Sequence, residues 1–167
     1  MSHRLPWSAL PTVVRRVIAD RLGSDVVRTT SAAGGFSPAM ACVADLADGR
    51  RVFIKAASTA QDPYTPDMMR GEAVINRGLS ADTAPAPRLL DTYDDGTWVV
   101  LIFEEITGRM PVIPWRPDEL ARVVPAVAGI AALTVSSALP PAAEVFGDMF
   151  TGWASLRDAA ASDPALG

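Results

Sequence analysis

The stretch that decides the fold is GGFSPAMACVADLADGRRVFIKA, residues 34–56. It opens with a glycine-containing turn, and two apolar runs, at 40–46 and from 51 to 57, predict neighbouring strands. The Asp-Gly dipeptide at 48–49 between them predicts a tight hairpin, because such turns favour residues that tolerate positive φ angles. The hairpin therefore carries Lys55, near the end of the second run, to the edge of a predicted antiparallel sheet.

The sequence on either side of this hairpin predicts two helices and three more strands. Apolar residues recur at helical spacing in two stretches, and short apolar runs bounded by turn residues occupy the others. The run WVVLIFE has no polar alternation, which indicates a strand buried on both faces. We expect helices at 11–22, ending at Gly23, and at 66–79, and strands at 26–33, 88–93 and 98–104.

The character of the chain changes after Gly108, where prolines at 111, 114 and 117 indicate a linker. One helix is expected at 118–139, with Asp118 as its N-cap, and another at 149–161. Strands followed by helices predict an α+β fold with two unequal parts. Residues 1–107 would form a small lobe with an N-terminal helix, and residues 108–167 a linker and an incomplete helical lobe.

Composition excludes several classes of function. The net charge of −4 and the pI of about 4.9 argue against a nucleic-acid partner, which requires a basic face. Cys42 is the only cysteine and His3 the only histidine, so an internal disulfide, a cysteine metal site and histidine-assisted nucleophilic catalysis are all excluded. The N-terminus does not resemble a signal peptide, and the uncharged stretch 123–139 is better explained as a core helix than as a membrane span. We expect a cytoplasmic protein.

Two charged residues on consecutive predicted elements form the first candidate site. Glu72 lies 17 positions after Lys55 (72 − 55) and falls between Met68 and Ile75 on an apolar helical stripe. A carboxylate in such surroundings requires a partner, because burying an unpaired charge is costly. Lys55 is the obvious cation, although a nearby arginine on the same helix or a partly exposed Glu72 would also satisfy the pattern.

The glycine turn and the end of the last strand complete the candidate site. Gly34 and Gly35 would let the backbone N–H groups approach phosphate oxygens, and Ser37 could add a hydroxyl. The segment Phe103-Glu104-Glu105-Ile106-Thr107-Gly108, called the hinge segment below, runs from a strand directly into the linker. Taken singly, an ordinary turn and an ordinary strand end explain these two features equally well.

The order of turn, strand lysine, helix glutamate, two strands and hinge resembles the small lobe of the protein-kinase-like fold. Two stretches of the sequence resemble the aminoglycoside phosphotransferase family. They are residues 34–56, quoted above, and residues 72–111, EAVINRGLSADTAPAPRLLDTYDDGTWVVLIFEEITGRMP. The resemblance covers roughly residues 25–135, and choline kinase-like and homoserine kinase-like relatives share most of it. It implies a five-stranded antiparallel sheet plus a helix, followed by the first helices of a large α-helical lobe.

The resemblance also implies a role for each candidate residue. Gly34, Gly35 and Ser37 would lie over the phosphates of ATP, Lys55 would contact them, and Glu72 would orient Lys55. Glu104, Glu105 and Ile106 would flank the adenine. Magnesium ions would bridge the phosphates in a complete family member, which transfers the γ-phosphoryl group to a hydroxyl of a small molecule. The acceptor and the preference for ATP or GTP stay open.

The family's catalytic residues have no counterpart in this sequence. The family has a His-Gly-Asp segment with a following Asn. The only similar stretch here is Phe146-Gly147-Asp148, in which Phe replaces His and Asp148 is better explained as a helix cap. We assign no catalytic and no metal-binding residue. We expect the chain to stop before the catalytic loop, to bind nucleotide weakly at best, and to accept a small-molecule substrate only if the rest of the large lobe is supplied.

Two other hypotheses fit the same residues. The chain could be a pseudokinase-like nucleotide-binding or regulatory module, with a partner chain or self-association covering exposed helices at 118–139 and 149–161. It could also be an unrelated α+β domain in which Lys55 and Glu72 form a purely structural ion pair. No membrane partner is expected under any of these hypotheses.

Overall fold

The computed structural model describes residues 4–32, 38–79 and 85–132, together with 141, 144, 147, 151–154 and 156–157. The chain divides into two compact units, 1–134 and 135–167, and each is described by itself. The predicted lobe boundary after residue 107 stays a prediction. Gly34, Gly35 and Ser37 lie outside the described residues.

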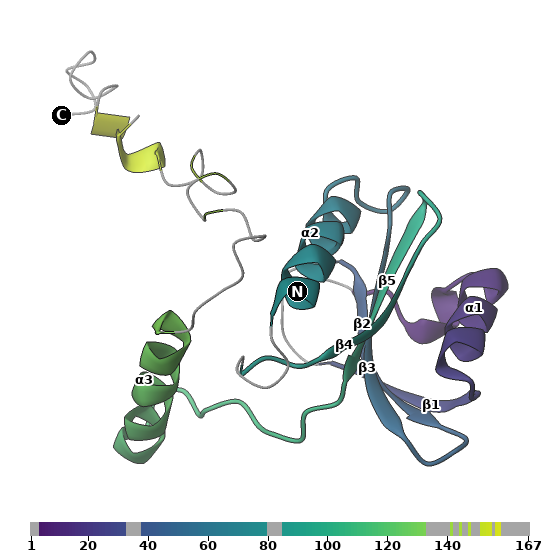
Figure 1. Cartoon of the computed structure of the whole chain (residues 1–167), viewed down its shortest axis with the longest axis horizontal. Helices are drawn as coiled ribbons and strands as arrows, with labels where there is room; N and C mark the ends of the chain where they lie inside the picture. Colours follow the sequence, from purple (N-terminus) through teal and green to yellow (C-terminus); the bar gives the residue numbers. More distant parts are fainter. Residues whose placement is uncertain are drawn as a thin grey trace. The chain divides into compact units, whose positions relative to one another are not determined.

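The first unit is built around a five-stranded antiparallel sheet (Figure 1). Each strand pairs with its neighbours in antiparallel register, and the fifth strand is inserted between the third and the fourth. The α+β fold class and the five-stranded sheet are therefore confirmed. The strands are β1 (Val26–Ser31), β2 (Met40–Leu46), β3 (Arg51–Ser58), β4 (Leu89–Asp94) and β5 (Trp98–Glu104), in the order β1-β2-β3-β5-β4.

The predicted hairpin joins β2 to β3. Gly49 has a φ of 87°, a left-handed conformation that glycine adopts without steric cost. The amide of Leu46 donates to the carbonyl of Arg50 at 2.9 Å and closes the turn. The hairpin fixes the register so that Lys55 lies opposite Ala41 on one side and Leu101 on the other, in the central strand of the sheet rather than at its predicted edge.

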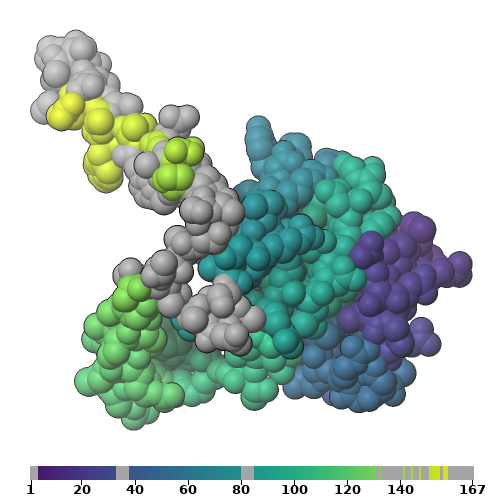
Figure 2. Space-filling model, viewed as in Figure 1, coloured from purple at the N-terminus to yellow at the C-terminus, as the bar shows by residue number. Residues whose placement is uncertain are grey.

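One face of the sheet is covered by helix α1 (Thr12–Leu22). The helix buries Val14, Ile18 and Leu22 in a cluster that includes Ile54 of β3 and residues of β2 and β5. In the space-filling view the purple atoms of α1 lie directly against the sheet (Figure 2). This face is a closed apolar core and contributes no residue to the candidate site.

The opposite face is covered in part by helix α2 (Thr65–Gly78). The predicted core stripe of this helix is wrong: Met68 is 74% exposed and Ile75 is 39% exposed. Met69 and Ala73 are buried instead, against β3 and β5. The helix is rotated by about one residue, or roughly 100°, from the predicted orientation, so Glu72 lies at the margin of the buried face rather than in its centre.

An arginine ties α2 to the turn between β4 and β5. The guanidinium of Arg70 donates to both carboxylate oxygens of Asp94, at 2.7 and 2.9 Å, and to Asp67 at 2.6 Å. The hydrogen bonds from Arg70 and from the N–H of Gly96 lower the pKa of Asp94 to about 2. Asp94 is therefore ionised at neutral pH, and the ion pair holds the helix in place above the sheet.

After the linker, helix α3 spans Pro117–Ala131. The predicted cap is wrong: the N-cap is Arg116, because Pro117, with its fixed φ, occupies the first turn, and Asp118 follows inside the helix. Glu119, also in the first turn, accepts hydrogen bonds from Arg109 and from the N–H of Val112, and so anchors the linker. Most of the predicted helix at 149–161 lies outside the described residues.

The apolar residues of α3 are mostly exposed, namely Leu120, Val124, Val127 and Ile130. In the part of the chain that the structure describes, no helix combines the length and the apolar character needed to cross a membrane.

Candidate functional site

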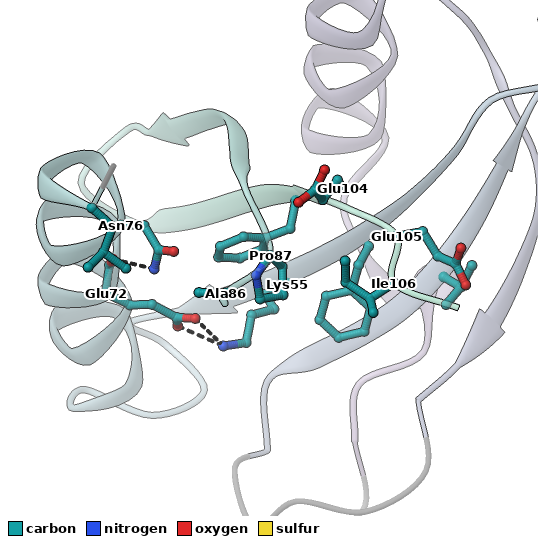
Figure 3. A pocket seen from close by; sticks show the side chains of 12 residues that line it. Lys55, Glu72, Asn76, Ala86, Pro87, Glu104, Glu105 and Ile106 are labelled. Carbon is teal, nitrogen blue, oxygen red and sulfur yellow. Dashed lines mark hydrogen bonds and ion pairs between the residues drawn. The ribbon is translucent and has the colours of Figure 1, made fainter. Parts of the chain in front are cut away.

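A pocket of about 550 Å³ opens on the α2 face of the sheet (Figure 3). Its walls come from the strands, from α2, from the segment before β4 and from the hinge segment. Its volume lies within the range of small-molecule sites, about 300–1,000 Å³. The lining residues are Val43, Phe53, Lys55, Glu72, Asn76, Leu79, Ala86, Pro87, Phe103, Glu104, Glu105 and Ile106.

The predicted pair of Lys55 and Glu72 lies in this pocket. The Lys55 Nζ donates to Glu72 Oε1 at 2.8 Å and to Oε2 at 2.6 Å. Both side chains are about one-third exposed, at 32% and 34%, so the ammonium group remains accessible to a ligand. The chain has 15 lysine and arginine residues, and Lys55 is the only lysine among them.

The floor of the pocket follows from the register of the strands. Alternate residues of β3 share a face, so Phe53 and Lys55 both point toward α2. Phe53 lies opposite Val43 of β2 and opposite Phe103 of β5. The Lys55 ammonium lies 5.9 Å from the centroid of the Phe103 ring, within the range of a cation–π contact. The pocket therefore has an apolar floor with one cation at its end.

The hinge segment forms the wall beyond the end of β5. Glu104 and Glu105 point their carboxylates away from Lys55 (Figure 3). Ile106 is 60% exposed, and its backbone groups form no hydrogen bond to any described residue. Free backbone N–H and C=O groups beside an apolar floor can pair with the edge of a planar, polar ring.

The structure thus brings five of the predicted site residues into one pocket: Lys55, Glu72, Glu104, Glu105 and Ile106. Their roles as ligand contacts stay predictions. The apolar members of the pocket were missed, although strand alternation from Lys55 could have found Phe53. Asn76 was missed as well. It lies one turn beyond Glu72 on α2 and donates its amide to the Glu72 carbonyl at 2.9 Å.

The other candidate groups of the chain lie elsewhere. Cys42 is buried on the α1 face, and this burial raises the pKa of its thiol to about 11, which suits a core residue rather than a nucleophile. Among the described residues, no group of three or more His, Cys, Asp and Glu side chains gathers where it could hold a metal ion.

No protein-family model matches the chain, and no curated protein matches it. Similar solved structures include two proteins described as "putative fructosamine-3-kinase". The one from Haemophilus somnus 129PT is 11% identical, with a TM-score of 0.40, over 59% of this chain and 32% of its own. The one from Thermobifida fusca YX-ER1 is 22% identical, with a TM-score of 0.39, over 59% of this chain and 33% of its own. The chain spans about a third of the length of these proteins.

The class of fold follows from the geometry of this chain itself. A five-stranded antiparallel sheet carries a lysine on its third strand, and a glutamate of the following helix pairs with that lysine. This combination is the small-lobe arrangement of the protein-kinase-like fold.

Proposed function

We propose that the chain is the ATP-binding part of a small-molecule phosphotransferase of the aminoglycoside phosphotransferase family. The observation that carries this proposal is the Lys55–Glu72 pair at the end of an apolar pocket. In kinases, the same pair between the third strand and the following helix holds the lysine against the nucleotide phosphates.

The pair gives Lys55 both a fixed position and a free donor. An ammonium group has three N–H donors, and Glu72 accepts through two oxygens, so another donor remains for a phosphate oxygen. The remaining basic residues are arginines, whose planar guanidinium favours two parallel bonds rather than a point contact. A compact ammonium group fits between a carboxylate and a phosphate, so a lysine at this position suits the proposed role.

The apolar part of the pocket suits the base. Phe53 and Phe103 offer flat aromatic surface with Val43 beside them, and the backbone of Ile106 offers polar groups that form no hydrogen bond to any described residue. Adenine would lie over this floor with its polar edge toward the hinge segment, and the phosphates would extend toward Lys55. The roles of Gly34, Gly35 and Ser37 above the phosphates remain part of the proposal.

The described residues are assigned no role in phosphoryl transfer. In the family, the γ-phosphoryl group passes to a hydroxyl of an aminoglycoside-like or other small metabolite, with magnesium neutralising the developing charge. This chain has no His-Gly-Asp segment, and its single histidine is at position 3. We therefore propose that these 167 residues bind the nucleotide without transferring its phosphate.

We expect ATP to stabilise the chain against unfolding. A ligand present at 100 times its Kd raises the free energy of unfolding by about 2.7 kcal/mol when it binds only the folded state. Thermal unfolding across an ATP series measures this effect. Adenosine and inorganic tripolyphosphate, which each carry half of the ligand, should stabilise less at equal concentration. An unchanged melting temperature at millimolar ATP would contradict the proposal.

A further inference from the structure

Four charged residues form a row across the sheet, called the charge row below: Arg28, Asp45, Arg51 and Glu105. Arg28 of β1 lies opposite Asp45 of β2, which lies opposite Arg51 of β3. Val52 lies opposite Glu104 in the next pair of strands, so Arg51 and Glu105, one residue further out on each side, face each other. The charges alternate in sign along the row, so each residue lies opposite a charge that attracts it, which stabilises the pairing of the strands.

The distances agree with this register. Asp45 accepts from the Nε of Arg28 at 2.5 Å and from the Nε of Arg51 at 2.9 Å. The Nη1 of Arg51 then lies 3.6 Å from Glu105 Oε1. Asp45 thus fixes the guanidinium of Arg51, and Arg51 presents its other end to the hinge segment.

Glu105 is the member of the row that most needs a partner. Its side chain is only 16% exposed, and it lines the candidate pocket. Thr107 donates its hydroxyl to the other carboxylate oxygen at 3.2 Å. A carboxylate buried to this extent is stable only when it is paired, so the contact with Arg51 constrains where the side chain and its backbone can lie.

The neighbouring glutamate is held from the other side of β5. Glu104 accepts a hydrogen bond from the backbone N–H of Arg88 at 2.8 Å, and the Arg88 guanidinium lies 3.8 Å away. Because β5 lies between β3 and β4, consecutive glutamates are anchored to opposite neighbours. We expect this double anchoring to restrict rotation of the backbone of 104–106 about the strand axis.

We propose that Arg51 is a positioning residue for base recognition. It holds Glu105, and through Glu105 it orients the backbone groups at 105–106 that would pair with the edge of the base. This inference rests on the proposed function, because it assigns those backbone groups to a nucleotide. Arg51 itself would not touch the ligand, so its removal should affect recognition of the base and leave recognition of the phosphates unchanged.

The test compares ATP with inorganic tripolyphosphate, which lacks the base. Arg51→Met should weaken ATP binding by roughly threefold to tenfold, with the affinity for tripolyphosphate unchanged. Arg51→Lys should restore much of the lost ATP affinity. Arg28→Met is the matched control, because Arg28 contacts the same Asp45 but not the hinge segment, and its ratio of ATP to tripolyphosphate affinity should equal that of the unmodified chain.

The outcomes separate this inference from the proposed function. If the unmodified chain binds no ATP, the proposed function fails and this inference fails with it. If it binds ATP and Arg51→Met leaves the ratio of the two affinities unchanged, only the positioning role is overturned. An equal loss for both ligands would also overturn that role, because a loss of stability alone weakens both.

Discussion

Replacing Lys55 by methionine is expected to weaken ATP binding about 10- to 100-fold, the equivalent of one hydrogen bond to a charged group. Methionine matches most of the length of the lysine stem and removes only the ammonium. The pocket floor formed by Phe53 and Phe103 should therefore keep its shape. Isothermal titration of both proteins with ATP measures the difference.

The same variant should leave the fold intact. Glu72 would lose its partner, but its side chain is about one-third exposed, so the cost to the free energy of unfolding should stay within about 1 kcal/mol. Arg77→Met is the matched control, because Arg77 is an exposed cation on the same helix that bonds to Thr92 and does not line the pocket. Equal ATP affinity in Lys55→Met and the unmodified chain would show that the Lys55–Glu72 pair is structural.

Replacing Ile54 by alanine is expected to lower the free energy of unfolding by about 2–5 kcal/mol, the range for large-to-small changes in a core. Ile54 is fully buried at the centre of β3, between Cys42 and Ile102 in the register. Alanine leaves a cavity there, because the helix and the strands around it are too closely packed to close on it.

Denaturant unfolding of the variant and the unmodified chain measures the loss. Val27→Ala on β1 is the matched control, since Val27 is exposed and its truncation should change stability by no more than about 0.5 kcal/mol. A loss below 1 kcal/mol for Ile54→Ala would mean that the α1 face of the sheet is not the main core.

The elements of the sheet could be predicted because their signals are local. The bounds of β2 and β5 agree with the predicted runs at 40–46 and 98–104, since each run is bounded by turn residues. The predicted burial of β5 on both faces is confirmed: its five central residues are all buried. Helices cover both faces of this strand, so no polar alternation was required.

The orientation of α2 could not be predicted from periodicity alone. Met68 and Met69 are adjacent, and each begins an apolar stripe, so the sequence supports two orientations that differ by one residue. The sheet selects the stripe with small Ala73, which allows the helix to approach β5 closely. Glu72 reaches Lys55 from the margin of this face, so the predicted pair formed although the predicted stripe was wrong.

The apolar floor of the site and the charge row depend on contacts across strands. Phe53 and Phe103 are 50 residues apart in sequence (103 − 53) and become neighbours only through the register of β3 and β5. Arg51 and Glu105 meet in the same way. Local patterns identified the charged ends of the pocket, whereas the register was needed to find the surface between them.

The most direct test of the central claim, that Lys55 contacts the phosphates of ATP in this pocket, uses the fact that it is the only lysine. An amine-directed acylating reagent can modify only the Lys55 side chain and the N-terminal amine, and peptide mass spectrometry distinguishes the two. The N-terminal amine serves as the internal control. We predict that saturating ATP slows acylation of Lys55 by about tenfold or more, as expected for an occupied site, while the N-terminal rate stays constant. An unchanged rate at Lys55 under saturating ATP would contradict the account.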